Sequence, residues 1–238
     1  MSTQAASPVA DLNAPARRDE HQGEGAVRGT ARMEAFADGV FAIAFTLPVV
    51  EIVLPSLDGQ DAKLGSELLK LWPSYLGYLL ASFVIGLYWV HHHFSGAIYR
   101  TTGHWFLIAT VVFLAGIGFI AFPARVFAEH LADTAAREAA TRYWVVGLAA
   151  LAWTWVFKWT VGWKRRQVDA RLEANYVKQL NRRYVAFAAL NTVAAALVFF
   201  DWRIGLALSS LLTLSLLWPP ATPRYVTEAP VVEGEVES

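Results

Sequence analysis

The sequence of 238 residues contains no cysteine and few charged side chains. Without cysteine, disulfides, thiol nucleophiles and thiolate metal sites are all excluded. Charged residues make up 17% of the chain, which is below the roughly 25% of an average soluble domain. The formal net charge is +0, so no overall electrostatic attraction to nucleic acid exists and no nucleic-acid partner is expected.

Apolar side chains dominate instead, and they come in long blocks. Hydrophobic residues form 55% of the chain, and its ten tryptophans suit the interfacial belts of a membrane protein. Six blocks approach the roughly 20 residues that a helix needs to cross the hydrocarbon core. They are 33–54, 72–93, 104–124, 142–163, 184–200 and 203–219. The sequence therefore predicts an all-α membrane protein with six transmembrane helices in the lipid bilayer.

Two details of these blocks carry further expectations. Only residues 201–203 separate the last two blocks, which predicts a tight helical hairpin. Lys158 lies near the end of the fourth block and is expected to snorkel to the membrane surface. A soluble helical bundle is disfavoured, because it would need polar stripes that the second and fourth blocks lack.

The two ends of the chain differ from the blocks between them. Residues 1–30 are polar, rich in Ala, Pro and Gly, and lack the apolar core of a signal peptide, so we predict a retained disordered tail. Residues 221–238 turn acidic and predict a second disordered tail. The transmembrane domain then comprises residues 31–220.

The lysines and arginines that flank the predicted helices indicate which side of the membrane each end of a helix faces. With the N-terminus in the cytoplasm, 13 of them fall on the inner side and six on the outer side, so both termini are expected inside. The run 163–184 carries most of this bias and predicts a cytoplasmic amphipathic helix. A basic face that binds anionic lipid is an alternative there, although the positive-inside rule alone accounts for the charge.

The first block separates into faces when it is drawn as a helix of about 100° per residue. One nearly continuous apolar stripe forms on it, with the hydroxyl of Thr46 about 60° to one side. The stripe contains Arg32, Phe36, Gly39, Ile43, Leu47 and Val50. On periodicity alone, packing against lipid or a neighbouring helix explains this stripe most simply.

Asp38 lies on another face and needs a different explanation. A carboxylate inside a membrane segment costs several kcal/mol unless it is paired, and it signals function by default. The topology brings Arg32 and the end of the second block to the same depth, so hydrogen bonds between Asp38, Arg32 and a histidine are expected. The candidate partners at that end are Trp89, His91 and His92.

The adjacent histidines 91–93 also raise the question of a metal. Neighbouring residues on a helix point about 100° apart, so three in a row do not chelate one ion as an HxxxH pair would. A structural network of Asp, His and Arg is favoured, no metal site is predicted, and proton sensing is a less favoured addition.

The first two blocks resemble a known family. The segment RMEAFADGVFAIAFTLPVVEI is similar to the signature R-x-x-x-F-S-D-G-V-F-A-I-A-x-T-L-L-V-L-E-I of the bacterial TMEM175 potassium channels. The second block, SYLGYLLASFVIGLYWVHHHF, resembles the family's YW-x-x-HH pattern. Two residues depart from the signature: Ala37 replaces a serine, and Pro48 replaces a leucine inside the first helix, where proline usually causes a kink.

The resemblance implies a homotetramer of six-helix subunits in a bacterial inner or plasma membrane, with the first helix of each subunit lining a central pore. It implies a constricting ring at Ile43, with Leu47 and Val50 farther along and Thr46 as a hydroxyl layer. Potassium is the expected permeant ion, no cofactor is expected, and the TVGYG filter motif is absent from the sequence. The residues expected to hold the helix in place are Arg32, Phe36, Asp38, Trp89, His91 and His92.

Two other functions compete with the channel. A proton-coupled transporter would use Asp38 and His91, but the chain lacks the internal repeats that carriers often show. A membrane enzyme would need convergent catalytic groups at one depth, and none is found away from the level of Arg32, Asp38 and His91. The protein is therefore not expected to be an enzyme.

Overall fold

The structure is a computed structural model that describes residues 29–54 and 64–226. Its regular elements in these ranges are helical, with two isolated β-bridges. The elements are α1 (Ala31–Thr46), η1 (Leu47–Glu51), α2 (Leu64–Lys70), α3 (Trp72–Ser95), η3 (Gly96–Ile98), α4 (His104–Phe119), α5 (Ala121–Glu129), α6 (Arg137–Lys164), α7 (Ala174–Leu197) and α8 (Trp202–Ser215).

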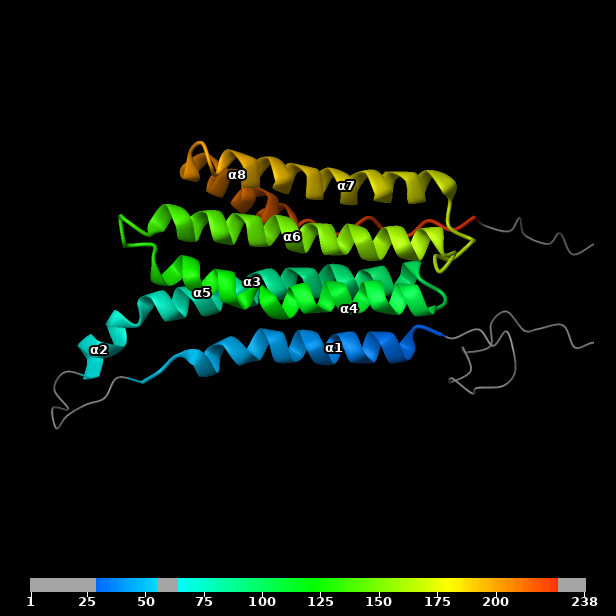
Figure 1. Ribbon diagram of the computed structural model, residues 1–238. Helices are drawn as coiled ribbons and strands as arrows, with labels where there is room; N and C mark the ends of the chain where they lie inside the picture. Colours follow the sequence, from blue (N-terminus) through cyan, green and yellow to red (C-terminus); the bar gives the residue numbers. More distant parts are fainter. Residues whose placement is uncertain (1–28, 55–63, 227–238) are drawn as a thin grey trace, which may run out of the picture.

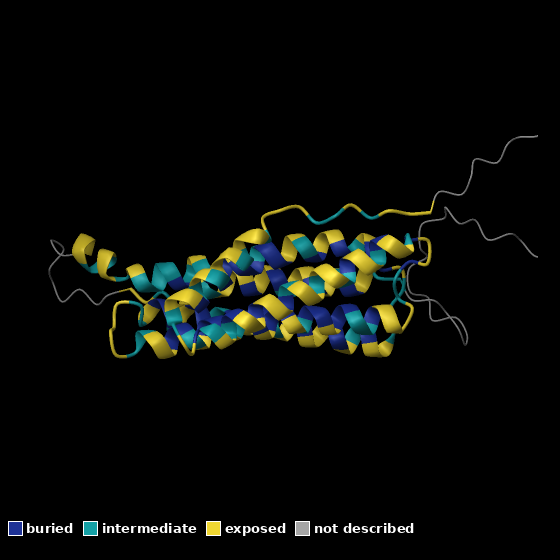
Figure 2. Ribbon diagram, turned by 90° about the horizontal axis from the view of Figure 1, so that it is seen from above, coloured by how far each residue is buried: buried dark blue, intermediate teal, exposed yellow. Residues whose placement is uncertain are grey.

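The helices form an elongated bundle in which α1 and the α7–α8 pair lie on opposite sides (Figure 1). Helices α3 and α4 pack next to α1, α5 packs against α3, and α6 lies between them and α7. Buried residues concentrate along the inner faces of the helices, and exposed residues mark the outer faces (Figure 2). The main core joins α1, α3, α4, α6 and α7 through side chains such as Phe41, Ile85, Phe113, Leu148 and Ala194.

Four helical segments of the described chain are long and apolar enough to cross a membrane. They are Ala31–Glu51, Trp72–Ile98, His104–Glu129 and Arg137–Lys164. The other two predicted spans differ from these: the first turns of α7 are basic, and α8 has 14 residues, about 21 Å, against a hydrocarbon core of about 30 Å. Composition and helix length therefore describe a multi-pass, all-α membrane protein.

Pro48 ends the first α-helix. Proline has no N–H to donate and its ring crowds the preceding turn, so the α-helical pattern stops at Thr46. The chain continues as the 3₁₀ helix η1, with Pro48 in its first turn. The expected kink is thus a change of helix type.

The expected hairpin between the last two blocks is confirmed. Helix α7 ends at Leu197, and Asp201 caps α8 by accepting a hydrogen bond from the Arg203 backbone N–H. The helices then cross closely: a Cβ atom on Gly205 would lie 2.6 Å from the Cα atom of Val198. Glycine at position 205 is therefore what allows the contact.

Two expectations about the ends of these helices need correction. Residues 163–184 do not form one amphipathic helix, because α6 ends at Lys164, a loop follows, and α7 begins at Ala174. Residues 221–226, assigned to the acidic tail, pack in extended form: the Tyr176 hydroxyl donates to the Ala221 carbonyl at 3.1 Å, and Tyr225 forms a β-bridge with Leu172. The remaining tail residues, 1–28 and 227–238, lie outside the described ranges.

Candidate functional site

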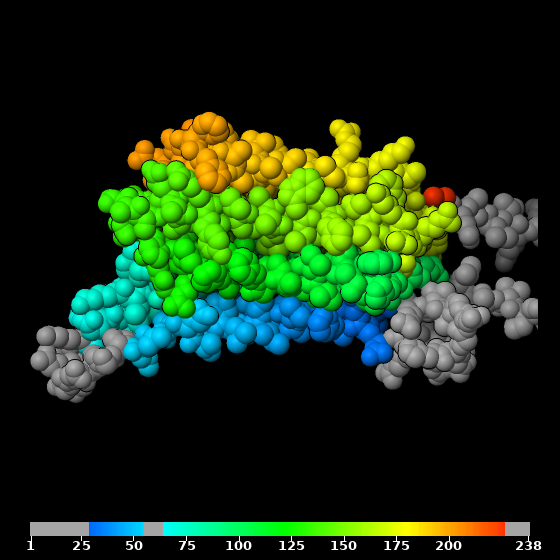
Figure 3. Space-filling model, in the orientation of Figure 1, coloured from blue at the N-terminus to red at the C-terminus, as the bar shows by residue number. Residues whose placement is uncertain are grey.

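Helix α1 presents two different faces. The residues that face the bundle are Met33, Ala37, Phe41 and Ala44. All six residues of the predicted stripe, Arg32, Phe36, Gly39, Ile43, Leu47 and Val50, are exposed. Helix α1 runs along one edge of the molecule (Figure 3). Within a single chain, the stripe therefore points away from the other helices. Ala37, which replaces the signature serine, points inward and is fully buried.

The change of helix type at Pro48 preserves the row of apolar side chains. Ile43 and Leu47 are four residues apart in the α-helical register, which places them on one face. Leu47 and Val50 are three residues apart, and in a 3₁₀ helix residues at that spacing eclipse one another. The three side chains are 58%, 54% and 71% exposed. They form one outward row across the change of helix.

Thr46 lies beside this row with its hydroxyl bound to its own helix. The Oγ1 atom is 2.9 Å from the Ala42 carbonyl oxygen and 3.2 Å from the Ile43 carbonyl oxygen, and it donates its proton to this pair. Donation leaves the lone pairs of the hydroxyl oxygen free to accept a hydrogen bond or to approach a cation. Because the residue is exposed, that oxygen is accessible from outside the single chain.

Asp38 contacts the second span through Trp89. The Trp89 Nε1–H donates a hydrogen bond to Asp38 Oδ1 at 3.1 Å, and the Trp89 ring lies 5.8 Å from the ring of His93. Both Asp38 and Trp89 are exposed. Phe36, grouped with them by sequence, is 58% exposed on the outer face of α1.

The structure separates His91 from Asp38. Side chains two residues apart on an α-helix are rotated by about 200° around its axis, so His91 and Trp89 point to opposite sides of α3. The Nε2 of His91 is instead 2.9 Å from the Leu216 carbonyl oxygen, beyond the end of α8. The expected pairing of Asp38 with His91 is therefore wrong.

His92 reaches α1 through aromatic packing. It is buried, and its ring meets the ring of Phe41 edge to face at 5.5 Å. It also lies 5.9 Å from the ring of Phe113 and 6.4 Å from that of Trp155. In the described part of the chain, its Nε2 has no hydrogen-bond partner. His92 therefore joins the packing between α1 and α3 without a hydrogen bond to Asp38.

Lys158 lies inside the bundle, so the predicted position of its side chain at the membrane surface is wrong. Its side chain does not snorkel: the residue is 1% exposed, and Nζ lies between the rings of Tyr99, Phe113 and Trp155, at 5.3, 5.5 and 5.1 Å from their centres. No hydrogen-bond partner for Nζ occurs within residues 29–54 and 64–226. An amine among the aromatic residues of α6 was the available signal, because ring faces attract cations.

The loop after α6 is held by ion pairs at the basic end of the bundle. Both carboxylate oxygens of Asp169 accept hydrogen bonds from Arg171, from Nε at 3.1 Å and from Nη2 at 2.8 Å. These hydrogen bonds hold the pKa of Asp169 below its ordinary value. Arg100 adds a second positive charge at 3.8 Å. Among the described residues, no group of three or more His, Asp and Glu side chains is arranged to hold a metal ion.

Comparison with known proteins identifies the family. The sequence profile described as endosomal/lysosomal potassium channel TMEM175 matches residues 32–121. A potassium channel of Chamaesiphon minutus is 36% identical over 174 residues, which are 72% of this chain and 85% of that protein. A potassium channel of Streptomyces collinus is 28% identical over 189 residues, or 78% and 90% of the two chains.

A solved structure agrees with these sequence matches. The crystal structure of a lysosomal potassium-selective channel TMEM175 homolog from Chamaesiphon minutus superposes with a TM-score of 0.66 at 31% identity, covering 79% of this chain and 96% of that one. These relatives are channels and not enzymes. The all-helical fold, the signature on α1 and the length of the matches together show that the chain belongs to the TMEM175 family.

Proposed function

We propose that the protein is a potassium-permeable cation channel of a bacterial cell membrane, assembled as a homotetramer with α1 of each subunit lining a central pore. Family membership supports the permeant ion, because relatives that match most of this chain are named potassium channels. No cofactor takes part in this proposal. The ion crosses between side chains and is not bound to a resident group.

The observation that carries this proposal is the polarity of the outward face of α1. Asp38 and Thr46 are both exposed on a helix that has the length and composition of a membrane span. Polar and ionised groups inside a membrane almost always face a bundle interior or a water-filled cavity. Copies of α1 arranged around an aqueous path would provide that environment, whereas lipid would not.

The outward row then supplies the parts of a pore. Ile43 forms a constricting ring, and Leu47 and Val50 continue the apolar wall. A hydrophobic constriction can gate by dewetting, and the hydroxyl of Thr46 can replace part of the water shell of an ion. With no TVGYG motif in the sequence, these side chains take the place of a filter of backbone carbonyls.

The proposed topology has six crossings with both termini in the cytoplasm. Helix α8 completes its crossing with segment 216–226, which is extended from Pro219 onward. This segment contacts α3, η3 and α7 and so has partners for its backbone. The basic end of the bundle, at the start of α1 and α7, faces the cytoplasm. The proton-coupled carrier is not favoured, because His91 points away from Asp38.

Cysteine crosslinking tests the assembly directly. The native chain has no cysteine, so Ile43→Cys introduces a single thiol. We expect oxidation in membranes to link copies through position 43, because the side chains converge on the axis. Ile204→Cys is the matched control, since Ile204 is 55% exposed on α8, on the far side of the bundle. Equal crosslinking of both variants, or none at position 43, would contradict the arrangement.

Potassium flux into liposomes tests the function. Ile43→Asn is expected to raise the flux by wetting the constriction, and Thr46→Ala is expected to lower the preference for potassium over sodium. Ile204→Asn, the same change on the far side, should leave both quantities near the wild-type values. If both α1 variants conduct like the wild type, the pore assignment is wrong.

A further inference from the structure

One feature that the channel proposal does not use is a cavity on the side of the bundle away from α1. It has a volume of about 400 Å³ and lies between α3, α6, α7, α8 and the chain that follows α8. This volume lies in the range of about 300–1,000 Å³ that ligand pockets occupy.

The cavity exists because α8 is short. The helix ends at Ser215, and Pro219, Pro220 and Pro223 prevent it from continuing. The chain crosses the remaining depth in extended form, and an extended strand covers less of α6 and α7 than a helix would. Ala152 on α6 and Ala186 on α7 leave further room, since both are small residues in the lining.

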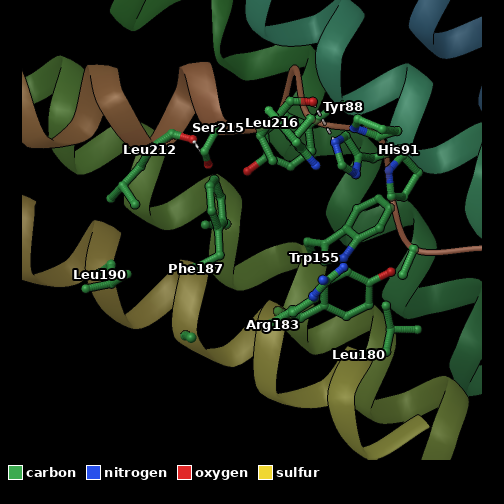
Figure 4. A pocket seen from close by; sticks show the side chains of 17 residues that line it. Tyr88, His91, Trp155, Leu180, Arg183, Phe187, Leu190, Leu212, Ser215 and Leu216 are labelled. Atoms are coloured by element: carbon green, nitrogen blue, oxygen red, sulfur yellow. Dashed lines mark hydrogen bonds between the residues drawn. The ribbon is translucent and has the colours of Figure 1, made fainter. Parts of the chain in front are cut away.

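The histidine and the arginine of the lining lie toward the same end of the cavity (Figure 4). His91, Trp155 and Arg183 lie on one side of the cavity, whereas Phe187, Leu190 and Leu212 lie on the other. From Arg183 to Leu190, the axis of α7 rises about 10 Å. The charged end faces the start of α7 and the basic loop, and the apolar end lies deeper in the bundle.

Arg183 provides the charge that defines the ligand. In the part of the chain that the structure describes, no carboxylate lies at ion-pair distance from it, unlike Arg171, which pairs with Asp169. Its neighbours on α7, Lys178 and Arg182, are also basic. An anionic group is therefore the complementary partner, and an arginine fork suits a phosphate.

We propose that this cavity binds an anionic phospholipid, with its phosphate at Arg183 and one acyl chain along Phe187, Leu190 and Leu212. The lipid would enter from the leaflet on the side of the basic loop, because basic pockets on that side of membrane helices bind anionic head groups. The acyl chain fills space that water would occupy poorly, since its lining is apolar. This site is separate from the pore and does not depend on ion conduction.

Lipid retention measures the proposal directly. The full-length protein is reconstituted in nanodiscs of phosphatidylcholine with a minor fraction of phosphatidylglycerol, released, and weighed by native mass spectrometry. We expect one phosphatidylglycerol to be retained per protomer in preference to phosphatidylcholine. Arg183→Gln should reduce this retention about tenfold, as expected for a hydrogen bond to a charged group. Arg182→Gln is the matched control, because Arg182 is exposed beside the cavity but does not line it.

A second pair of variants tests the place of the acyl chain. Ala186→Phe fills the cavity and should reduce retention of either lipid, whereas Ala189→Phe, at an exposed position outside the lining, should not. If Arg182→Gln and Arg183→Gln lower the retention of phosphatidylglycerol equally, the lipid is held only by general attraction to the basic surface. That result would overturn the site. Equal retention of both lipids, retention of neither, or full retention by Ala186→Phe would overturn it as well. Because the readout is mass, a failure here leaves the channel proposal intact, and loss of ion flux does not affect this test.

Discussion

Helices α1 and α6 have similar apolar compositions but very different surroundings. Over their most apolar 18 residues, 22% of the segment formed by α1 and η1 and 56% of α6 are buried within the chain. Helix α6 contacts α4, α5, α7 and α8, and its Lys158 lies among aromatic rings. Helix α1 buries one narrow face and leaves the other open. Apolar sequence alone therefore predicts that a helix enters the membrane but not what it meets there.

The difference also concerns polar groups. Two polar groups of α1, those of Asp38 and Thr46, are exposed, whereas the amine of Lys158 is enclosed within the bundle. An open polar group can be satisfied by water or by another subunit. An enclosed one has only the groups that the fold provides, so the two kinds respond differently to substitution.

The sharpest test of the two faces of α1 compares two phenylalanines. Phe41 is 2% exposed and Phe36 is 58% exposed. Phe41→Ala should lower the free energy of unfolding by about 3–5 kcal/mol, because it leaves a cavity between α1, α3 and α4. Phe36→Ala should change it by about 0.5 kcal/mol or less in monomeric protein. Thermal unfolding in detergent measures both. Similar losses from the two changes would mean that the outer face is also packed within one chain.

The enclosed lysine of α6 provides a second test with the opposite sign. Lys158→Met removes an amine that has no hydrogen-bond partner in the described ranges and keeps the volume of the side chain. Replacing a buried charge by an apolar group is often neutral or stabilising, so we expect a gain of about 1 kcal/mol. Lys164→Met, at the exposed end of the same helix, should have little effect. A loss of stability from Lys158→Met would show that the cation–π contacts outweigh the cost of burying the amine.

The smallest effect concerns the ion pairs that hold the ends of the two helices. The Asp169 side chain is 8% exposed, whereas Glu51, which pairs with Arg125 beyond α1, is 56% exposed. Asp169→Asn should cost about 1 kcal/mol, and Glu51→Gln about 0.5 kcal/mol or less. Unfolding in detergent at neutral pH would measure both losses of stability.

The Asp169 contribution should also depend on pH. Hydrogen bonds from Arg171 lower the folded-state pKa of Asp169, so its stabilisation is present above the unfolded value of about 3.9. The stabilisation is lost as the pH falls through the folded pKa. Wild type and Asp169→Asn should therefore converge in stability on acidification. A difference that stays constant down to the lowest measurable pH would exclude this carboxylate as its source.

Much of the architecture was predictable from local pattern. Each of the six apolar blocks contains a helix in the described ranges, and the hairpin at 201–203 formed. Pro48 altered the first helix because proline acts through its own ring and its missing N–H. These features depend on residues near one another in the chain, and periodicity reports such relations well.

The partners of individual side chains were harder to predict. Membrane depth placed Asp38, Trp89 and His91 at one level, but depth does not specify direction around a helix. The rotation of α3 gave Asp38 the indole of Trp89 and sent His91 toward Leu216. Lys158 was close enough to the end of α6 to snorkel by length alone, yet the rotation of α6 directed it inward.

By itself, the sequence determined the class of the protein, its number of apolar segments and the apolar stripe of α1, because burial in lipid and helical periodicity both depend on residue type and spacing. Only the tertiary structure decided that the stripe faces outward, that Lys158 lies among aromatic rings and that a cavity opens where α8 stops. Those outcomes depend on how helices rotate and pack against one another, and packing involves residues from distant parts of the chain.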